Sequence, residues 1–104
     1  MHRLTILYGA PTDPAHFRRY YEETHIPIAR GMQGLSAWNL SWIEPGADGA
    51  TPWILVAELY AESSAAMDAV LASPDGQAAT SDLANFVTGT ALFLRGDEVP
   101  VTLG

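Results

Sequence analysis

The sequence predicts an α+β fold of the ferredoxin-like type, in which two helices cover one face of a four-stranded antiparallel sheet. One observation is the order of apolar segments along the 104 residues, which is strand, helix, strand, strand, helix, strand. Right-handed crossovers turn this order into a ferredoxin-like sheet. The other observation is the composition, with 48% hydrophobic and 16% charged residues. Residues 1–104 therefore form one domain, with more apolar surface than a small core buries.

The first strand and helix have clear sequence signals. Residues 3–9 (RLTILYG) are rich in β-branched and aromatic side chains, and the turn cluster GAPTDP follows them. Asp13 is a good N-cap acceptor, and Pro14 after it fits the first turn of a helix. The apolar spacing extends this helix from Pro14 to Thr24. Pro27 disfavours a helical conformation at the residue before it, so the helix is expected to end or kink there.

The remaining elements follow from the same rules of periodicity and turn chemistry. Strands are predicted at 35–44 and 53–60, on either side of a loop rich in glycine and proline at 45–52. A helical segment at 63–73 is followed by a second one, 74–86, that restarts at a proline. The last strand is predicted at 90–96.

Two of these strands are apolar on both sides. A strand with one wet face alternates apolar and polar residues, whereas WILVAELY (53–60) and TALFL (90–94) carry apolar side chains on both faces. The sheet face without helices therefore needs an apolar cover. The simplest cover is a second copy of the chain, so a homodimer is expected.

Charge and composition exclude several functions. Five Lys and Arg against 12 Asp and Glu give a net charge of −7, which repels a phosphate backbone and argues against nucleic acid. No apolar run approaches the ~20 residues of a membrane span. The absence of cysteine removes thiolate chemistry and is compatible with a cytoplasmic location. The three histidines lack metal-ligand spacing, and no G-x-G-x-x-G loop is present, so neither a metal nor another cofactor is expected.

One histidine stands out as a catalytic candidate. Phe17, Tyr21 and His25 are spaced at i, i+4 and i+8 and share one helix face. An imidazole titrates near neutral pH and can act as a general acid or base. The alternative is a structural histidine that hydrogen-bonds a carbonyl near Pro27. The residues alone leave both interpretations open.

Aromatic residues supply candidate ligand contacts. Most belong in the core, but tyrosine and tryptophan can also line a pocket and orient a ligand with their polar tips. Asn39, beside Trp38, is expected on the opposite face of its strand. Glu58 interrupts the apolar third strand: an inward position would raise its pKa by desolvation and make it an acid–base partner, whereas an edge position leaves it solvated. The candidate substrate-binding residues are Tyr8, Phe17, Tyr21, Trp38, Glu58 and Phe86.

Two stretches resemble a known family. DPAHFRRYYEETHIPIAR (13–30) resembles the opening helix of EthD-domain proteins, including an aromatic pair and a T-H-x-P turn at 24–27. The stretch from 56 to 86 resembles the second half of the same family, which is associated with ethyl tert-butyl ether degradation. The resemblance implies a dimeric α+β barrel, in which two ferredoxin-like units pack sheet on sheet. Relatives of this barrel include cofactor-free monooxygenases, lactone isomerases, polyketide cyclases and haem-dependent enzymes, so the fold does not name a reaction.

Three functional hypotheses remain. The first is a cofactor-free enzyme that binds a small apolar molecule, aromatic or carbonyl-bearing, and uses His25 as its acid or base. Tyrosine hydroxyls would hold an enolate or phenolate oxygen, as oxygenation, isomerisation, cyclisation or decarboxylation requires. The second is a binding or accessory protein with the same pocket and no chemistry. The third is a haem protein with His25 as axial ligand.

Overall fold

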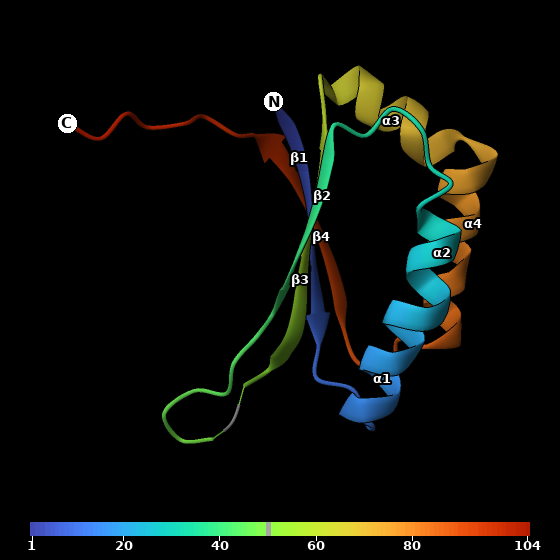
Figure 1. Ribbon diagram of the computed structural model, residues 1–104, viewed down its shortest axis with the longest axis vertical. Helices are drawn as coiled ribbons and strands as arrows, with labels where there is room; N and C mark the ends of the chain where they lie inside the picture. Colours follow the sequence, from blue (N-terminus) through green and yellow to red (C-terminus); the bar gives the residue numbers. More distant parts are fainter. Residues whose placement is uncertain (50) are drawn as a thin grey trace.

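Four antiparallel strands form one sheet in the order β2-β3-β1-β4 (Figure 1). The strands are β1 (His2–Gly9), β2 (Ala37–Trp42), β3 (Trp53–Ala61) and β4 (Ala91–Asp97). The structure is a computed structural model and describes residues 1–49 and 51–104; Ala50, in the loop predicted at 45–52, lies outside the described residues. The strand order and the antiparallel pairing confirm the predicted ferredoxin-like α+β fold.

All helices lie on one face of this sheet, as predicted (Figure 1). They are α1 (Pro14–Tyr20), the π-helix η1 (Tyr21–His25), α2 (Ile26–Ala29), α3 (Ser64–Ala72), α4 (Pro74–Asp82) and the 3₁₀ helix η2 (Leu83–Asn85). The Asp13 carboxylate caps α1 by accepting from the His16 N–H at 3.1 Å. Ser73 caps α4 in the same way, through the Gly76 N–H at 3.1 Å. Among the described residues, no helix has the length and apolarity that a membrane crossing requires.

The first helix continues past the expected break at Pro27. In a regular α-helix a proline lacks the N–H that the turn needs, and its ring clashes with the carbonyl four residues earlier. Here η1 opens the turn: the Ile26 N–H donates to the Tyr21 carbonyl, five residues back. This wider π turn accommodates the proline, and the chain continues as α2. The same turn ends at His25, which is buried.

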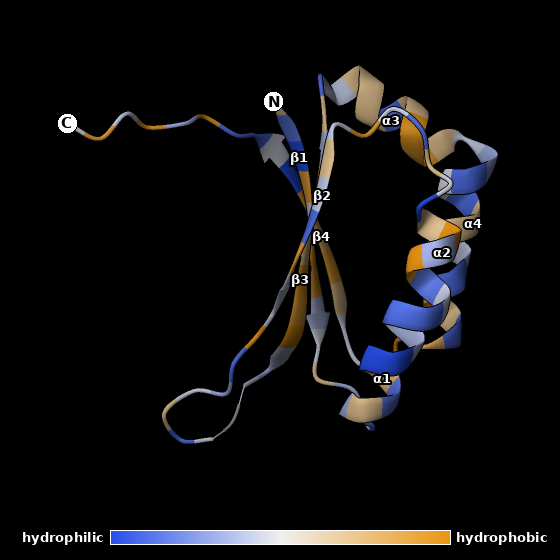
Figure 2. Cartoon of the chain, viewed as in Figure 1, coloured by the Kyte–Doolittle hydropathy of each residue, from blue (hydrophilic) through white to orange (hydrophobic). Residues whose placement is uncertain are grey.

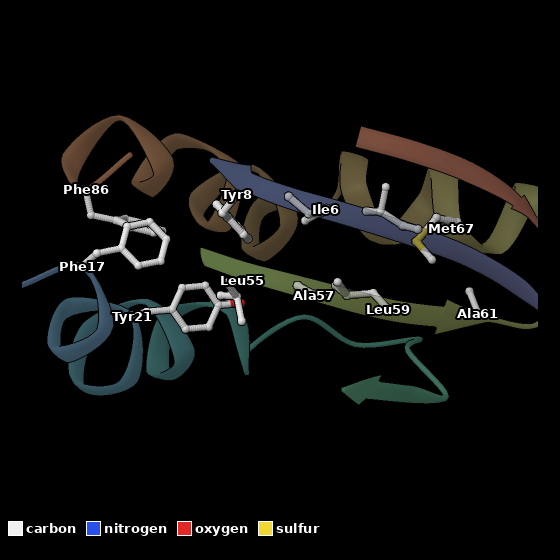
Figure 3. Close-up of a cluster of buried hydrophobic side chains, with 11 residues drawn as sticks. Ile6, Tyr8, Phe17, Tyr21, Leu55, Ala57, Leu59, Ala61, Met67 and Phe86 are labelled. Atoms are coloured by element: carbon white, nitrogen blue, oxygen red, sulfur yellow. The ribbon is translucent and has the colours of Figure 1, made fainter. Parts of the chain in front are cut away.

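The core lies between the helices and the sheet. Leu4, Ile6 and Tyr8 of β1 lie opposite β4 residues 95, 93 and 91, and next to Leu59, Ala57 and Leu55 of β3. Buried aromatic rings from the helical side close the core at one end of this row, beside Tyr8 and Leu55, as Figure 3 shows for Phe17, Tyr21 and Phe86. Burial is therefore concentrated on the helix-covered face.

The opposite face of the sheet is open and partly apolar. Leu7 of β1 lies beside Val56 and Leu92, and Leu94 follows on the same side of β4. Leu92 and Leu94 are 42% and 55% exposed. Figure 2 shows hydrophobic residues along β3 and β4, although no element of the described chain covers this side. Strands that are apolar on both faces, as predicted, thus leave one apolar face uncovered.

Candidate functional site

A histidine and an aspartate meet inside the protein, where the first helical segment packs against α4. His25 Nδ1 lies 2.9 Å from Asp82 Oδ2, and the two residues are only 4% and 5% exposed. Desolvation pushes the pKa of Asp82 upward, but hydrogen bonds from Asn85, Tyr20 and His25 outweigh it and hold that pKa below its usual value. The carboxylate is therefore ionised at neutral pH and can only accept, so Nδ1 carries the proton of this hydrogen bond.

Local structure brings these two residues together. α2 and α4 are in contact, which sets the end of η1 beside the C-terminal part of α4. Gly76 allows α4 to start directly against the end of α3, because an added Cβ there would overlap the Val70 carbonyl oxygen. Asp82 then lies on the inner side of α4, three residues after the buried Ala79.

Further contacts fix the imidazole. The Tyr20 hydroxyl donates to Asp82 Oδ1 at 2.7 Å, and the Asn85 amide donates to the same oxygen at 2.9 Å. The hydrogen bond to this carboxylate raises the pKa of Tyr20. The His25 ring lies 4.9 Å from both the Tyr21 and the Phe86 ring, centroid to centroid. A histidine held through Nδ1–H presents Nε2 as the nitrogen with a lone pair.

His25 lines a small cavity between the helices and the sheet. Tyr8 and Trp38 line it from the strands, Tyr21 lines it from η1, and Phe93 lines it from β4. About 40 Å³ of it is free, which holds water but is far below the ~300–1,000 Å³ typical of ligand sites. Phe93 is 49% exposed, so the cavity meets the surface at β4. A ligand larger than water requires side chains at this mouth to move.

The polar groups of the cavity wall are mainly donors. Burial raises the pKa of Tyr8 and of Tyr21, which also hydrogen-bond to one another, so both phenols keep their protons. The Trp38 indole nitrogen is buried and makes no well-formed hydrogen bond within the described residues, although it lies close enough to the Tyr21 hydroxyl to interact. Donors of this kind suit a ligand that presents an acceptor oxygen.

The structure brings together part of the predicted site. The predicted residues that line the cavity are Tyr8, Tyr21, His25 and Trp38. Phe17 and Phe86 are buried behind them, where they pack against these rings without lining the cavity. Glu58 pairs with Thr5 and Asn39 on the opposite face of the sheet and accepts from the Tyr60 hydroxyl at 2.8 Å. Glu58 is therefore not inward, and it is not at an edge either, because β3 is a central strand; its side chain lies on the open face and does not belong to this cavity.

Asp82 is the member of the site that the sequence prediction missed. It falls three residues after Ala79 and four before Phe86, within the apolar stripe of its helix. A carboxylate in such a stripe has to find partners when it is buried. This polar interruption is the signal that could have pointed to Asp82.

The haem hypothesis does not fit this cavity. A porphyrin is at least as large as the ligands that fill ~300–1,000 Å³ sites, whereas about 40 Å³ is free beside His25. The rings of Tyr21 and Phe86 also pack closely around the imidazole, each with its centroid 4.9 Å away. Within residues 1–49 and 51–104, no cluster of three or more His, Cys, Asp or Glu side chains could hold a metal ion.

Comparisons with known proteins agree with this fold. The EthD domain model matches residues 10–90. The "uncharacterized 11.0 kDa protein in thcB-thcC intergenic region" of Rhodococcus erythropolis is 36% identical over 102 residues, which cover 97% of this chain and 98% of that protein. The crystal structure of an EthD family protein from Bacillus halodurans C-125 has a TM-score of 0.89 and 25% identity, with 95% and 99% of the two chains covered. A dimeric protein of unknown function and ferredoxin-like fold from Bacteroides fragilis NCTC 9343 has a TM-score of 0.67 and 9% identity, with 93% and 95% covered. The chain belongs to the EthD domain family.

Proposed function

We propose that the protein is a cofactor-free enzyme that binds a small, largely apolar molecule beside His25 and moves one of its protons. The observation that carries this proposal is the 2.9 Å hydrogen bond between His25 and the buried, ionised Asp82 at the wall of a cavity. A structural histidine needs one hydrogen bond to a carbonyl. The three donors gathered around a buried carboxylate instead suit a group whose charge changes during a reaction.

The proposed chemistry starts with Nε2 of His25. This nitrogen accepts a proton from the ligand, either from a carbon next to a carbonyl or from a phenol. Asp82 stabilises the imidazolium that forms and holds the ring in the required tautomer. One of the two phenols, Tyr8 or Tyr21, donates a hydrogen bond to the enolate or phenolate oxygen that develops, because the other uses its single proton in the hydrogen bond between them. A positioned base of this kind contributes about 10²–10⁴-fold to the rate.

The cavity wall restricts the ligand class. Leu4, Ile6 and Leu59 form an apolar floor on the sheet, so the ligand is small and aromatic or aliphatic apart from its oxygen. Oxygenation, isomerisation, cyclisation and decarboxylation all start from the same proton transfer. Membership of the EthD family does not choose among them, because function resides in sites and not in folds.

The protein is also proposed to act as a homodimer. Support comes from the open apolar sheet face around Leu7, Val56, Leu92 and Leu94. A two-fold dimer that covers this face would bury more than ~1,000 Å², the scale of a stable interface. The related ferredoxin-like fold from Bacteroides fragilis is described as dimeric.

A paired experiment tests the proposed function. A panel of small aromatic ketones and phenols is screened by chemical-shift changes in ¹H–¹⁵N spectra, and turnover of each binder is then measured. His25→Gln keeps a hydrogen-bonding side chain but cannot cycle a proton, so it should keep binding and lose turnover by about 10²–10⁴-fold. Full turnover in His25→Gln would refute the base role and favour the binding-protein alternative. Failure of every panel member to perturb the cavity amides would refute the ligand class.

A further inference from the structure

The C-terminal segment of the chain leaves the body of the protein with its apolar side chains exposed. Beyond β4, the residues Val99, Val101 and Leu103 are 77%, 79% and 91% exposed. They alternate with Pro100 and Thr102, so an extended segment presents all three apolar side chains on one side. Exposed apolar residues in a row of this kind mark a surface that binds something. We call residues 99–104 the tail.

The tail points into the space beside the open sheet face. Figure 1 shows the helices on one side of the sheet and the tail leaving on the other. In Figure 2 the tail carries hydrophobic residues along its length, away from every other element. The open face and the tail therefore border the same empty region, and both are partly apolar.

The direction of the tail is fixed at its root. The Glu98 N–H donates to the Met1 carbonyl at 2.9 Å, which extends the pairing of β1 with β4 by one residue. Glu98 Oε2 accepts from the Tyr60 hydroxyl at 2.9 Å and lies 3.4 Å from Arg3 Nη1. Tyr60 and Arg3 belong to the open face, so the root of the tail is bound to that face. Glu98 is therefore held in place, and this fixes the direction in which the tail leaves the sheet.

We infer that the tail is exchanged between two copies of the chain: it crosses from one copy and packs its apolar side chains on the other. A second copy that faces the open sheet would occupy the region into which the tail points. Two-fold symmetry makes the exchange reciprocal, so both tails are buried by one arrangement. Pro100 suits such a position, because proline is tolerated in an edge strand, where its missing N–H is not needed. The inference rests on the homodimer proposed above.

Dimer strength tests the inference. The chain truncated after Glu98, the variant Val101→Asp and the matched control Thr102→Asp are compared with the full chain by sedimentation equilibrium, with circular dichroism to check folding. Burial of a single valine or leucine changes the dimerisation constant by more than tenfold. Two tails with three apolar side chains each would bury six such residues, and the entropy lost on ordering the tails offsets part of this gain. We expect truncation and Val101→Asp to weaken the dimer by about 100-fold or more, and Thr102→Asp by less than about threefold.

A mixed-copy experiment tests whether the contact lies between copies. The chain has no cysteine, so Val101→Cys provides a single site for a nitroxide label. Labelled chains are mixed with ¹⁵N-labelled chains without the nitroxide, and line broadening is measured in the ¹⁵N copy alone. Broadening confined to one surface of the ¹⁵N copy is the expected result.

The possible outcomes distinguish a failure of the tail exchange from a failure of the homodimer. An unchanged dimer after truncation, or the absence of broadening in the mixed dimer, would overturn the tail exchange and leave the homodimer standing. A full-length chain that stays monomeric at high micromolar concentration would overturn both. Truncated chains that remain folded and become monomeric support the exchange.

Discussion

Asp82→Asn changes the charge of the buried carboxylate while keeping its size. In the native protein Asp82 Oδ1 accepts from Tyr20 and Asn85, and Oδ2 accepts from His25 Nδ1. In the variant, the asparagine oxygen can keep the first two donors. Its NH₂ group then faces His25, so the imidazole has to offer a lone pair on Nδ1 and carry its proton on Nε2. The substitution therefore preserves the packing and removes the proton acceptor from the cavity.

The expected loss of stability is about 1–2 kcal/mol at neutral pH. A hydrogen bond to a charged group contributes about 1.5–3 kcal/mol and a neutral one about 0.5–1.5 kcal/mol. Asp82 is only 5% exposed, so its charge carries a desolvation cost in the folded protein. The neutral asparagine does not have this cost, which offsets part of the stability lost with the charged hydrogen bonds. The pKa of Asp82 is lowered in the folded state, so its stabilisation is fully present above its unfolded pKa of about 3.9 and is lost as the pH falls through the folded value.

Urea unfolding of both proteins from pH 7 to pH 3.5 measures this effect. The difference in unfolding free energy between native protein and Asp82→Asn should be present at pH 7 and should shrink below about pH 4. Long-range ¹H–¹⁵N spectra of the histidine ring should show protonated Nδ1 in the neutral native form and protonated Nε2 in the variant. A stability difference that is constant across this pH range, or a native ring protonated on Nε2, would show that Asp82 is not the ionised partner of His25 Nδ1.

Three further substitutions test the packing and the assembly. Phe86→Ala removes a ring that is 3% exposed and lies 4.9 Å from the His25 ring. Urea unfolding should show that the free energy of unfolding falls by about 3–5 kcal/mol, and a fall below about 1 kcal/mol would contradict the packing. Gly76→Ala places a Cβ against the Val70 carbonyl oxygen, so the melting temperature should fall by the equivalent of about 1–3 kcal/mol, with an unchanged melting temperature as the opposing result. Leu94→Asp puts a charge on the open sheet face, and light scattering should give twice the chain mass for the native protein and a monomer for the variant; equal masses would place the interface elsewhere.

The fold could be predicted because its signals are local and repeated. The predicted strand at 53–60 corresponds to β3, and the Asp13 cap starts α1 as expected. The second strand is shorter than predicted, Ala37–Trp42 in place of 35–44, because apolar residues continue past the last paired position. The π turn was not predicted. Pro27 signals a break in the hydrogen bonding, but sequence does not say whether the chain stops or opens a wider turn.

The site could be predicted only in part, because its key contact is distant in sequence. Helical spacing identified Tyr21 and His25 on one face. Asp82, the partner of His25, is 57 positions further along the chain, and no local pattern connects them. Glu58 was ambiguous for a different reason: its strand is apolar on both sides, so alternation alone does not tell the helix-covered face from the open one.

A crystal structure of the complex with a small aromatic ketone or phenol from the binding screen is the decisive test of proton transfer to His25. The ligand should lie in an enlarged cavity, with an acidic position within about 2.6–3.2 Å of His25 Nε2 or linked to it by one water. His25 Nδ1 should stay on Asp82, and Phe93 should move at the mouth. A ligand bound elsewhere, or one in the cavity with Nε2 turned away from it, would rule out His25 as the base.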